Sequence, residues 1–577
     1  MNKFRDRFTA KMYRRLYLPS LLTAIGLAFA DMADALVVGR NMGATGLASI
    51  SLALPVYMVI NLFMHSLGAG GSVRYSKLLG EGKLELAQKC YTVILRTALA
   101  VSVLLAVLGN VFLEPLLRVL GAIKEENPAL YQASRAYLQI IVSGIPLFFF
   151  AYILNYFLRN DDNQRLASVA FIIGNCVDVA LNFVFVLILD WGVAGAAWST
   201  LIGYCVTICL YLPGLLSKKH SLKLRRARSA PKEALSCFAS GFSVSSQYLL
   251  QMIFLIIVNN VLLRMMRNEN GVAVFDMLQN MSFLVLYQYD ASAKAAQPLI
   301  STYCGEQNKT GQQNAMRLAL ITGTISGGFI VSLICIFPVF VCRLFGLKEA
   351  GIIELAKPAI WIFCLSLPAA GISTILESGY QASDRERAGF TVALLRGGLI
   401  LLPMTLLFSV IGNPRIFWWL FPATEYLSLI LALLIAPRFR TKHLPEERVL
   451  ARTIMNKNED IGALTQEAAA FCEKWEASAK QTFYVSITIE EICLAIMQNA
   501  FDQSADGYIQ MTLVAMPDGV FELHIRDNAT AFDPFSLAEK SGEAFNIDAA
   551  GMIVIKNKAK DFFYRRYQGF NALVVRV

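Results

Sequence analysis

Long apolar stretches fill the first three quarters of the chain. Each is about 20 residues long or longer, the length that an α-helix needs to cross the hydrocarbon of a bilayer. Twelve stretches have this character: 16–40, 46–72, 91–113, 134–158, 166–189, 192–214, 236–263, 272–303, 314–342, 352–380, 388–411 and 415–436. A basic linker at 215–235 separates the first six from the last six. The pattern predicts a mostly α, twelve-helix membrane bundle of two six-helix lobes, over 16–214 and 236–437, after a basic segment at 1–15.

The last quarter of the chain has a different pattern. It alternates amphipathic helical stretches with strand-like ones. Helices are predicted at 459–476 and 482–502 and strands at 508–516 and 520–526, and a loop, a short helix near 551–560 and two final strands follow. A Pro517-Asp518-Gly519 turn separates the first two strands. We therefore expect a soluble α/β sandwich domain over 458–577, joined to the membrane part by a linker at 438–457.

Composition and charge support this division. Of the 577 residues, 56% are hydrophobic and 16% are charged, which excludes a chain made only of soluble domains. Residues 1–442 carry 39 Lys and Arg against 23 Asp and Glu, whereas residues 443–577 carry 13 against 19. Basic loops remain on the cytoplasmic side, so we expect a multi-pass protein of the cell membrane with both termini in the cytoplasm. No basic cluster of the kind that binds nucleic acid occurs, and we expect no such partner.

Four polar residues interrupt the apolar stretches of the first lobe: Asp34, Asp178, Asn182 and Thr200. An ionised side chain in hydrocarbon is costly, so it needs a partner or a purpose. Two carboxylates, an amide and a hydroxyl offer oxygen ligands for Na⁺ or a relay for protons. Alternatively, each Asp forms a structural hydrogen bond with a neighbouring helix. The scattered cysteines and histidines show no metal-binding spacing, so we expect no metal site.

The second lobe has charges of its own. Asp276, Asp290, Lys294 and Glu377 lie within predicted spans, and we expect them to line a substrate cavity. Asp290 and Lys294 are four residues apart and share one helix face. They are either a switchable pair in that cavity or a neutralised structural pair.

Several motifs make the membrane part similar to the multidrug and toxin extrusion (MATE) family of cation-coupled efflux transporters. They are DALVVGRNMGATGLASISLALP, IIGNCVDVALNF, GVAGAAWST, AAQPLISTYCGEQN, LLRGGLILLP and FPATEY. The resemblance spans residues 10–437 and places Asp34 on the family's first-helix carboxylate and Thr200 on its sixth-helix threonine. In the fifth helix the family often has Asn and then Asp, whereas this chain has Asp178 and then Asn182.

The tail resembles the GHKL ATPase fold, in the style of the anti-sigma-factor serine kinases. The likeness rests on EEICLAIMQNA, RDNATAFDP and the segment that begins AAGMIVIKNK. It places Glu491 on the catalytic base, Asp527 on the residue that reads adenine, and Gly551 in the lid. The family's Mg²⁺-binding Asn is replaced by Ala495, and one glycine of the adenine box by Ala529. The resemblance therefore implies a degenerate domain that no longer turns over ATP with Mg²⁺. It either serves protein binding or regulation, or still binds a nucleotide weakly.

Together these observations predict a secondary active antiporter and not an enzyme, with no cofactor. Na⁺ or H⁺ would drive the export of organic, drug-like compounds, and a cytoplasmic regulatory protein would bind the tail. Membrane lipid surrounds the bundle. Two other functions remain open, a membrane sensor that signals through its tail and a flippase for a lipid-linked saccharide. The absence of a G-x-x-x-x-G-K-[ST] loop disfavours an ATP-driven pump.

Overall fold

A computed structural model gives the fold of the chain. It describes residues 2–80, 84–160, 164–216, 222–225, 231–383, 385–439, 444–455, 459–501, 507–536, 552–556, 559, 561–567 and 570–577. The α-helices of the membrane part are α1 (Asn2–Gly80), α2 (Leu84–Val111), α3 (Leu113–Leu120), α4 (Pro128–Ser143), α5 (Ile145–Asn160), α6 (Gln164–Asn182), α7 (Gly192–Leu216), α8 (Pro231–Met266), α9 (Asn270–Gly305), α10 (Lys309–Ile336), α11 (Pro338–Leu344), α12 (Ala350–Ala382), α13 (Glu386–Leu394), α14 (Leu401–Ile411), α15 (Pro414–Phe417) and α16 (Leu420–Ile435). Two π-helical segments, η1 (Phe183–Ile188) and η2 (Leu395–Leu399), follow α6 and α13, and two short 3-10 helices, η3 (Ala436–Arg438) and η4 (Glu446–Arg448), lead into the tail.

All twelve predicted spans lie on helices, but the structure does not divide them into twelve separate membrane-crossing helices. The first two lie on α1, in which two helices meet at a kink at Gly43, where the backbone is not helical and φ is 61°. A side chain is strained in that conformation, so glycine suits the kink. By length and composition, nine helices in the described part could cross a membrane, or ten if the bent pair α4 and α5 counts as one span. The lower number arises because α1 counts once and because α9, which carries Asp276, Asp290 and Lys294, is not counted.

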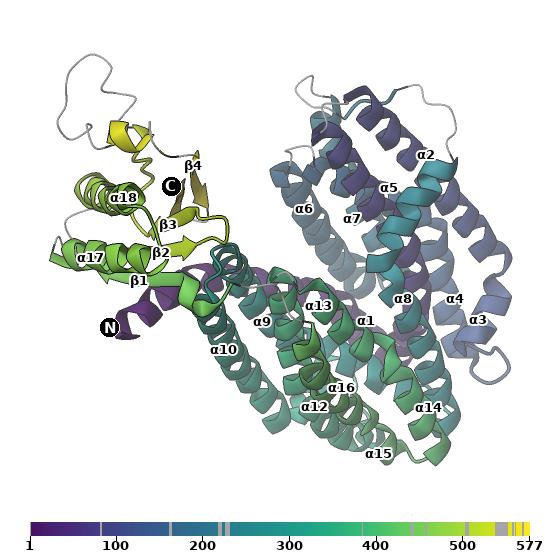
Figure 1. The fold of residues 1–577 in the computed structure, drawn as a ribbon. Helices are drawn as coiled ribbons and strands as arrows, with labels where there is room; N and C mark the ends of the chain where they lie inside the picture. Colours follow the sequence, from purple (N-terminus) through teal and green to yellow (C-terminus); the bar gives the residue numbers. More distant parts are fainter. Residues whose placement is uncertain are drawn as a thin grey trace.

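The membrane helices form two groups, with α2 to α7 in one and α9, α10, α12, α13 and α16 in the other (Figure 1). Two long helices join them. α1 packs against helices of both groups, and α8 contacts α2 and α3 on one side and α9 and α14 on the other. The sequence division into six and six helices is therefore bridged by shared elements, and a shift between the groups must involve α1 and α8.

The tail is a mixed α/β domain. Its sheet has the order β1-β2-β3-β5-β4 with antiparallel pairing throughout, and the helices α17 (Glu459–Lys474) and α18 (Ala479–Asn499) pack against it. The strands are β1 (Val449–Met455), β2 (Tyr508–Ala515), β3 (Phe521–Asp527), β4 (Asp561–Tyr567) and β5 (Phe570–Arg576). Two helices and two strands lie where the sequence predicts them. β1 lies inside the segment 438–457 that we expected to be a linker, because its short mixed sequence, VLARTIM, lacks regular alternation.

The interior strand β2, which lies between β1 and β3, shows how the tail sits in the molecule. All of its residues are buried, although an isolated two-layer domain would leave one face of the sheet in water. Ile509, Met511 and Leu513 belong to the tail's core with α17 and α18. Tyr508 packs into the core of the membrane part, with its ring 6.5 Å from that of Phe8. The second face of the sheet is therefore covered by membrane helices, and Figure 1 shows the tail and the N-terminus side by side at one end of the second helix group.

Candidate functional site

Three of the four predicted cation-binding residues, Asp34, Asp178 and Thr200, line a central cavity of about 550 Å³, whereas Asn182 is buried and is not among its lining residues. α1 supplies Asp34, α6 supplies Asp178, α7 supplies Thr200 and α9 supplies Asp276. Three carboxylates from three helices therefore line one cavity, although they are far apart in sequence. None of the described residues that line this cavity is Lys or Arg.

Asn182 connects two of these helices. Its amide nitrogen donates a hydrogen bond to Asp34 Oδ1, while its own Oδ1 is buried and has no hydrogen-bond partner in the described part of the chain. An unsatisfied buried oxygen is costly unless something binds there. The exchanged order of Asp178 and Asn182 thus places the amide against Asp34 and leaves the Asp178 carboxylate one turn away.

Asp178 lies where α6 and α7 approach closely. A Cβ atom on Gly203 would lie 2.9 Å from the Asp178 Cβ, so only glycine permits this approach. Asp178 Oδ1 is buried without a hydrogen-bond partner among the described residues. Thr200 donates its hydroxyl proton to the Ala196 carbonyl at 3.1 Å, which leaves the hydroxyl oxygen available as an acceptor. Asp178, Asn182 and Thr200 therefore present oxygen atoms that suit a small cation.

Aromatic side chains form much of the cavity wall, and the sequence analysis did not single them out. They are Tyr57, Tyr137, Tyr152, Phe171, Tyr204, Phe283 and Tyr287. The hydroxyl oxygens of Tyr57 and Tyr137 lie 3.2 Å apart. Within an apolar span, an inward-facing tyrosine and one that packs in the core have the same spacing, so only the assembled helices distinguish them. The wall can stack with a flat organic molecule and attract its positive charge.

The four residues expected in a substrate cavity are not all together. Asp276 lines the central cavity and accepts a hydrogen bond from the Asn280 amide at 3.1 Å. Asp290, Lys294 and Glu377 are not among its lining residues. Lys294 Nζ lies 2.6 Å from Asp290 Oδ2, and Glu377 accepts from the Gln381 amide at 3.4 Å.

Another intramembrane pair lies beside Glu377. The Arg396 guanidinium bonds the Glu425 carboxylate at 2.8 Å, and both side chains are mostly buried. Each charge there has its partner, so the pair has a structural role.

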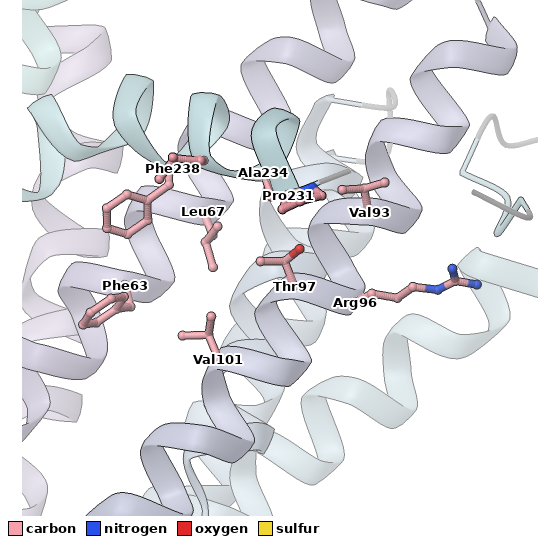
Figure 2. A pocket seen from close by; sticks show the side chains of 10 residues that line it. Phe63, Leu67, Val93, Arg96, Thr97, Val101, Pro231, Ala234 and Phe238 are labelled. Atoms are coloured by element: carbon pink, nitrogen blue, oxygen red, sulfur yellow. The ribbon is translucent and has the colours of Figure 1, made fainter. Parts of the chain in front are cut away.

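A second pocket, of about 430 Å³, opens between α1, α2 and α8 (Figure 2). Its lining is apolar, with Phe63 and Leu67 from α1, Val101 from α2 and Phe238 from α8. Arg96 also borders it, but Figure 2 shows the guanidinium pointing away from these side chains. Arg96 is also not among the described residues that line the central cavity.

The expected nucleotide site of the tail has a different character. Asp527 is 2% exposed, and its Oδ1 accepts hydrogen bonds from the Asn571 amide at 2.8 Å and the Ala529 backbone N–H at 2.9 Å. Burial, together with the charge of Asp527, raises the pKa of the Cys493 thiol to about 12. Glu491 lies on α18, and Gly551 lies outside the described residues. The side chain expected to read adenine is therefore used by the chain itself.

The opposite face of the tail sheet holds a buried ion pair with the membrane part. Arg526 on β3 bonds Glu306, the residue that follows α9, and its guanidinium lies 4.4 Å from the centre of the Tyr303 ring. Burial lowers the pKa of Arg526, but Glu306 and Tyr303 raise it more, so that it stays above its usual value. Thr512 also donates to Glu306 at 3.3 Å. The pair fixes the tail to the end of α9.

Comparison with known proteins matches both parts. The MatE family profile matches residues 19–184 and 240–407, and that of the histidine kinase-like ATPase domain matches residues 454–577. The probable multidrug resistance protein YoeA of Bacillus subtilis is 22% identical over 424 residues, which are 72% of this chain and 90% of that protein. The FAD transporter of Shewanella oneidensis is 24% identical over 432 residues, 73% of this chain and 93% of that protein.

Solved structures show the same fold. An inward-facing multidrug resistance MATE transporter gives a TM-score of 0.64 at 21% identity, covering 73% of this chain and 97% of the other. The MATE multidrug transporter DinF-BH, solved in complex with a ligand, gives a TM-score of 0.58 at 24% identity, covering 74% of this chain and 95% of the other.

Proposed function

The chain belongs to the MatE family of membrane transporters, and we propose that it is a secondary active antiporter that exports organic, drug-like compounds. A Na⁺ or H⁺ gradient would supply the energy. The observation that carries the proposal is the central cavity, where three carboxylates from three helices face an aromatic wall.

Charge indicates the class of cargo. A cavity with Asp34, Asp178 and Asp276 and without a basic residue in its described lining favours a cation. The names of the relatives point to different transported compounds: two are called multidrug proteins and one is called an FAD transporter. FAD carries a negatively charged diphosphate, so this cavity suits it poorly. A lipid-linked saccharide also carries phosphate, which disfavours the flippase alternative.

The proposed coupling ion binds at Asp34, Asp178, Asn182 and Thr200. Asn182 ties α6 to α1 through Asp34, and α1 packs against both helix groups. An ion or proton at Asp34 changes the charge of the carboxylate that accepts this hydrogen bond, so the two orientations of the groups would bind the ion unequally. Unequal binding is what allows a gradient to drive a conformational equilibrium.

We assign the tail a regulatory role on the cytoplasmic side. Asp527 is already bonded by Asn571, and the Mg²⁺-binding asparagine is replaced by Ala495. Asn499 lies one turn beyond the position of the lost ligand, and its amide nitrogen donates to the Ala495 carbonyl at 2.9 Å. The contact between Arg526 and Glu306 places the tail against α9, a helix that lines the central cavity. The same contact would allow a membrane sensor to signal through its tail, which is the alternative function.

The test uses proteoliposomes and the fluorescent cation rhodamine 6G, with Na⁺ and proton gradients imposed separately. Wild-type protein should move the dye under one of the two gradients, which identifies the coupling ion. Asp34→Asn should abolish that movement, whereas Glu125→Gln, an exposed acid in the loop before α4, should not. A folded wild-type protein that moves no dye under either gradient would contradict the proposal.

A further inference from the structure

One face of α9 carries a row of mostly polar or small residues from the central cavity to the tail. At about 100° per residue, the following positions fall within about 60° of one line along the helix: Asp276, Asn280, Phe283, Tyr287, Asp290, Lys294, Gln297, Ser301 and Gly305. The first four line the central cavity, and the last two line a different cavity at the tail. The row therefore spans about eight helical turns, and about four of them separate Tyr287 at the central cavity from Ser301 at the tail cavity.

Exposure increases along this row. Asn280 is 9% exposed, the Asp290 side chain 29% and the Lys294 side chain 57%. An exposed acid and base in the middle of a membrane helix are costly if they face lipid. The neighbouring helix α10 exposes Ile325, Phe329 and Ile336, as a lipid-facing surface should. The polar face of α9 therefore faces water.

The cavity at the end of the row has a volume of about 650 Å³ and is bounded by both parts of the chain. α9 contributes Ser301 and Gly305, and the tail sheet contributes Glu522, His524 and Phe563. Glu522 accepts a hydrogen bond from Arg576 at 2.7 Å, and its Oε2 lies 3.6 Å from the His524 ring. The Phe563 ring is 57% exposed beside these charges.

Three basic residues along the polar face of α9 and the tail cavity each form an ion pair with an acidic residue. Lys294 pairs with Asp290, Arg526 with Glu306 and Arg576 with Glu522. A cation entering along this face meets no uncompensated positive charge from these three bases. It meets an exposed aromatic ring at the tail and three carboxylates at the far end.

We propose that the polar face of α9 is the cytoplasmic entry passage for substrate and that the cavity between α9 and the tail is its first binding site, which takes aromatic organic cations. The inference rests on the proposed export function and adds that the tail forms part of the substrate path. Substrate would stack against Phe563 before it moves along α9 to Asp276.

The first experiment tests whether the passage holds water. Gln297→Cys and, as a lipid-facing control, Ile325→Cys react with a charged, membrane-impermeant maleimide in vesicles that expose the tail. Mass spectrometry reads labelling at each position, because native cysteines are also present. We expect labelling at 297 and none at 325, with rhodamine 6G slowing the reaction at 297. No labelling at 297, or equal labelling at both, would overturn the passage.

The second experiment tests the binding site. A Cβ on Gly305 meets no atom within 4 Å, so Gly305→Trp fills the cavity without disturbing the helix packing. It should lower the initial rate of rhodamine 6G transport by about tenfold, equivalent to about 1.4 kcal/mol. Gly351→Trp, at an equally open glycine away from this cavity, should have no effect.

A third variant separates binding from turnover. Phe563→Ala should raise the apparent KM for rhodamine 6G and leave the maximal rate unchanged, whereas Phe483→Ala, at an equally exposed ring on α18, should change neither. If wild type moves no dye, the export function itself is wrong. If wild type moves dye and Gly305→Trp and Phe563→Ala both behave as wild type, the export function stands and the tail site is wrong.

Discussion

Asp178 and Asp527 are carboxylates at two family motifs, and the structure places them in opposite situations. Asp178 borders a cavity, and one of its oxygens has no hydrogen-bond partner in the described part of the chain. Asp527 is buried and receives hydrogen bonds from Asn571 and Ala529. A motif residue can act on a ligand only if the chain leaves it available. In the membrane part Asp178 keeps an oxygen that can accept a ligand, whereas in the tail Asp527 already accepts hydrogen bonds from the chain.

The largest expected effect comes from Asp178. Asp178→Asn removes a charge that faces the cavity and should reduce gradient-driven dye transport to background. Asp527→Asn is the matched change in the tail and should leave the transport rate at the wild-type value. Equal loss in both variants would show that the two sites are not as different as the structure indicates.

The exchanged order in the fifth predicted span gives a sharper form of this test. The double variant Asp178→Asn with Asn182→Asp restores the family's usual order. Because Asn182 donates to Asp34, a carboxylate at 182 would face another carboxylate and repel it. We expect the double variant to remain inactive at neutral pH, and full recovery of dye transport would contradict the geometry.

The next effect is on docking of the tail. Arg526→Met leaves Glu306 buried without its partner, which typically costs about 3–5 kcal/mol. The tail should detach, and limited proteolysis in the linker before β1 should become faster. Glu306→Leu combined with Arg526→Met removes both charges and should recover much of the protection. Equal protection in wild type and Arg526→Met would mean that the pair does not hold the tail.

A smaller effect concerns pH. His524, whose ring lies 3.6 Å from the carboxylate, lowers the pKa of Glu522, burial opposes this, and Arg576 lowers it further. A carboxyl whose pKa is depressed on folding adds stability above its unfolded value, about 4.3, and loses it as the pH falls further. The melting temperature of the docked tail should decrease when the pH is lowered below about 4.3. Glu522→Gln should make the melting temperature depend less on pH in this range. An unchanged slope in Glu522→Gln would exclude this carboxyl as the cause.

Sequence reasoning reached the two-part organisation because apolar length and strand alternation are local signals. It also selected Asp34, Asp178 and Thr200, since polar groups are conspicuous within spans. It did not separate Asp276 from Asp290, because only the assembled helices show which turn of α9 reaches the cavity. β1 has no clear alternation, and the tyrosines of the cavity wall look like any aromatic core residue until their neighbours are in place. The bond between Asn571 and Asp527 joins residues 44 positions apart, which spacing cannot reveal.

The central claim is that an ion gradient drives transport through the membrane cavity and that the tail does not use ATP. The most direct test measures rhodamine 6G transport by one wild-type preparation in proteoliposomes with four conditions: an ion gradient, ATP with Mg²⁺ on the tail side, both, or neither. The account predicts transport whenever the gradient is present and no increase with ATP. Transport driven by ATP without a gradient would contradict it.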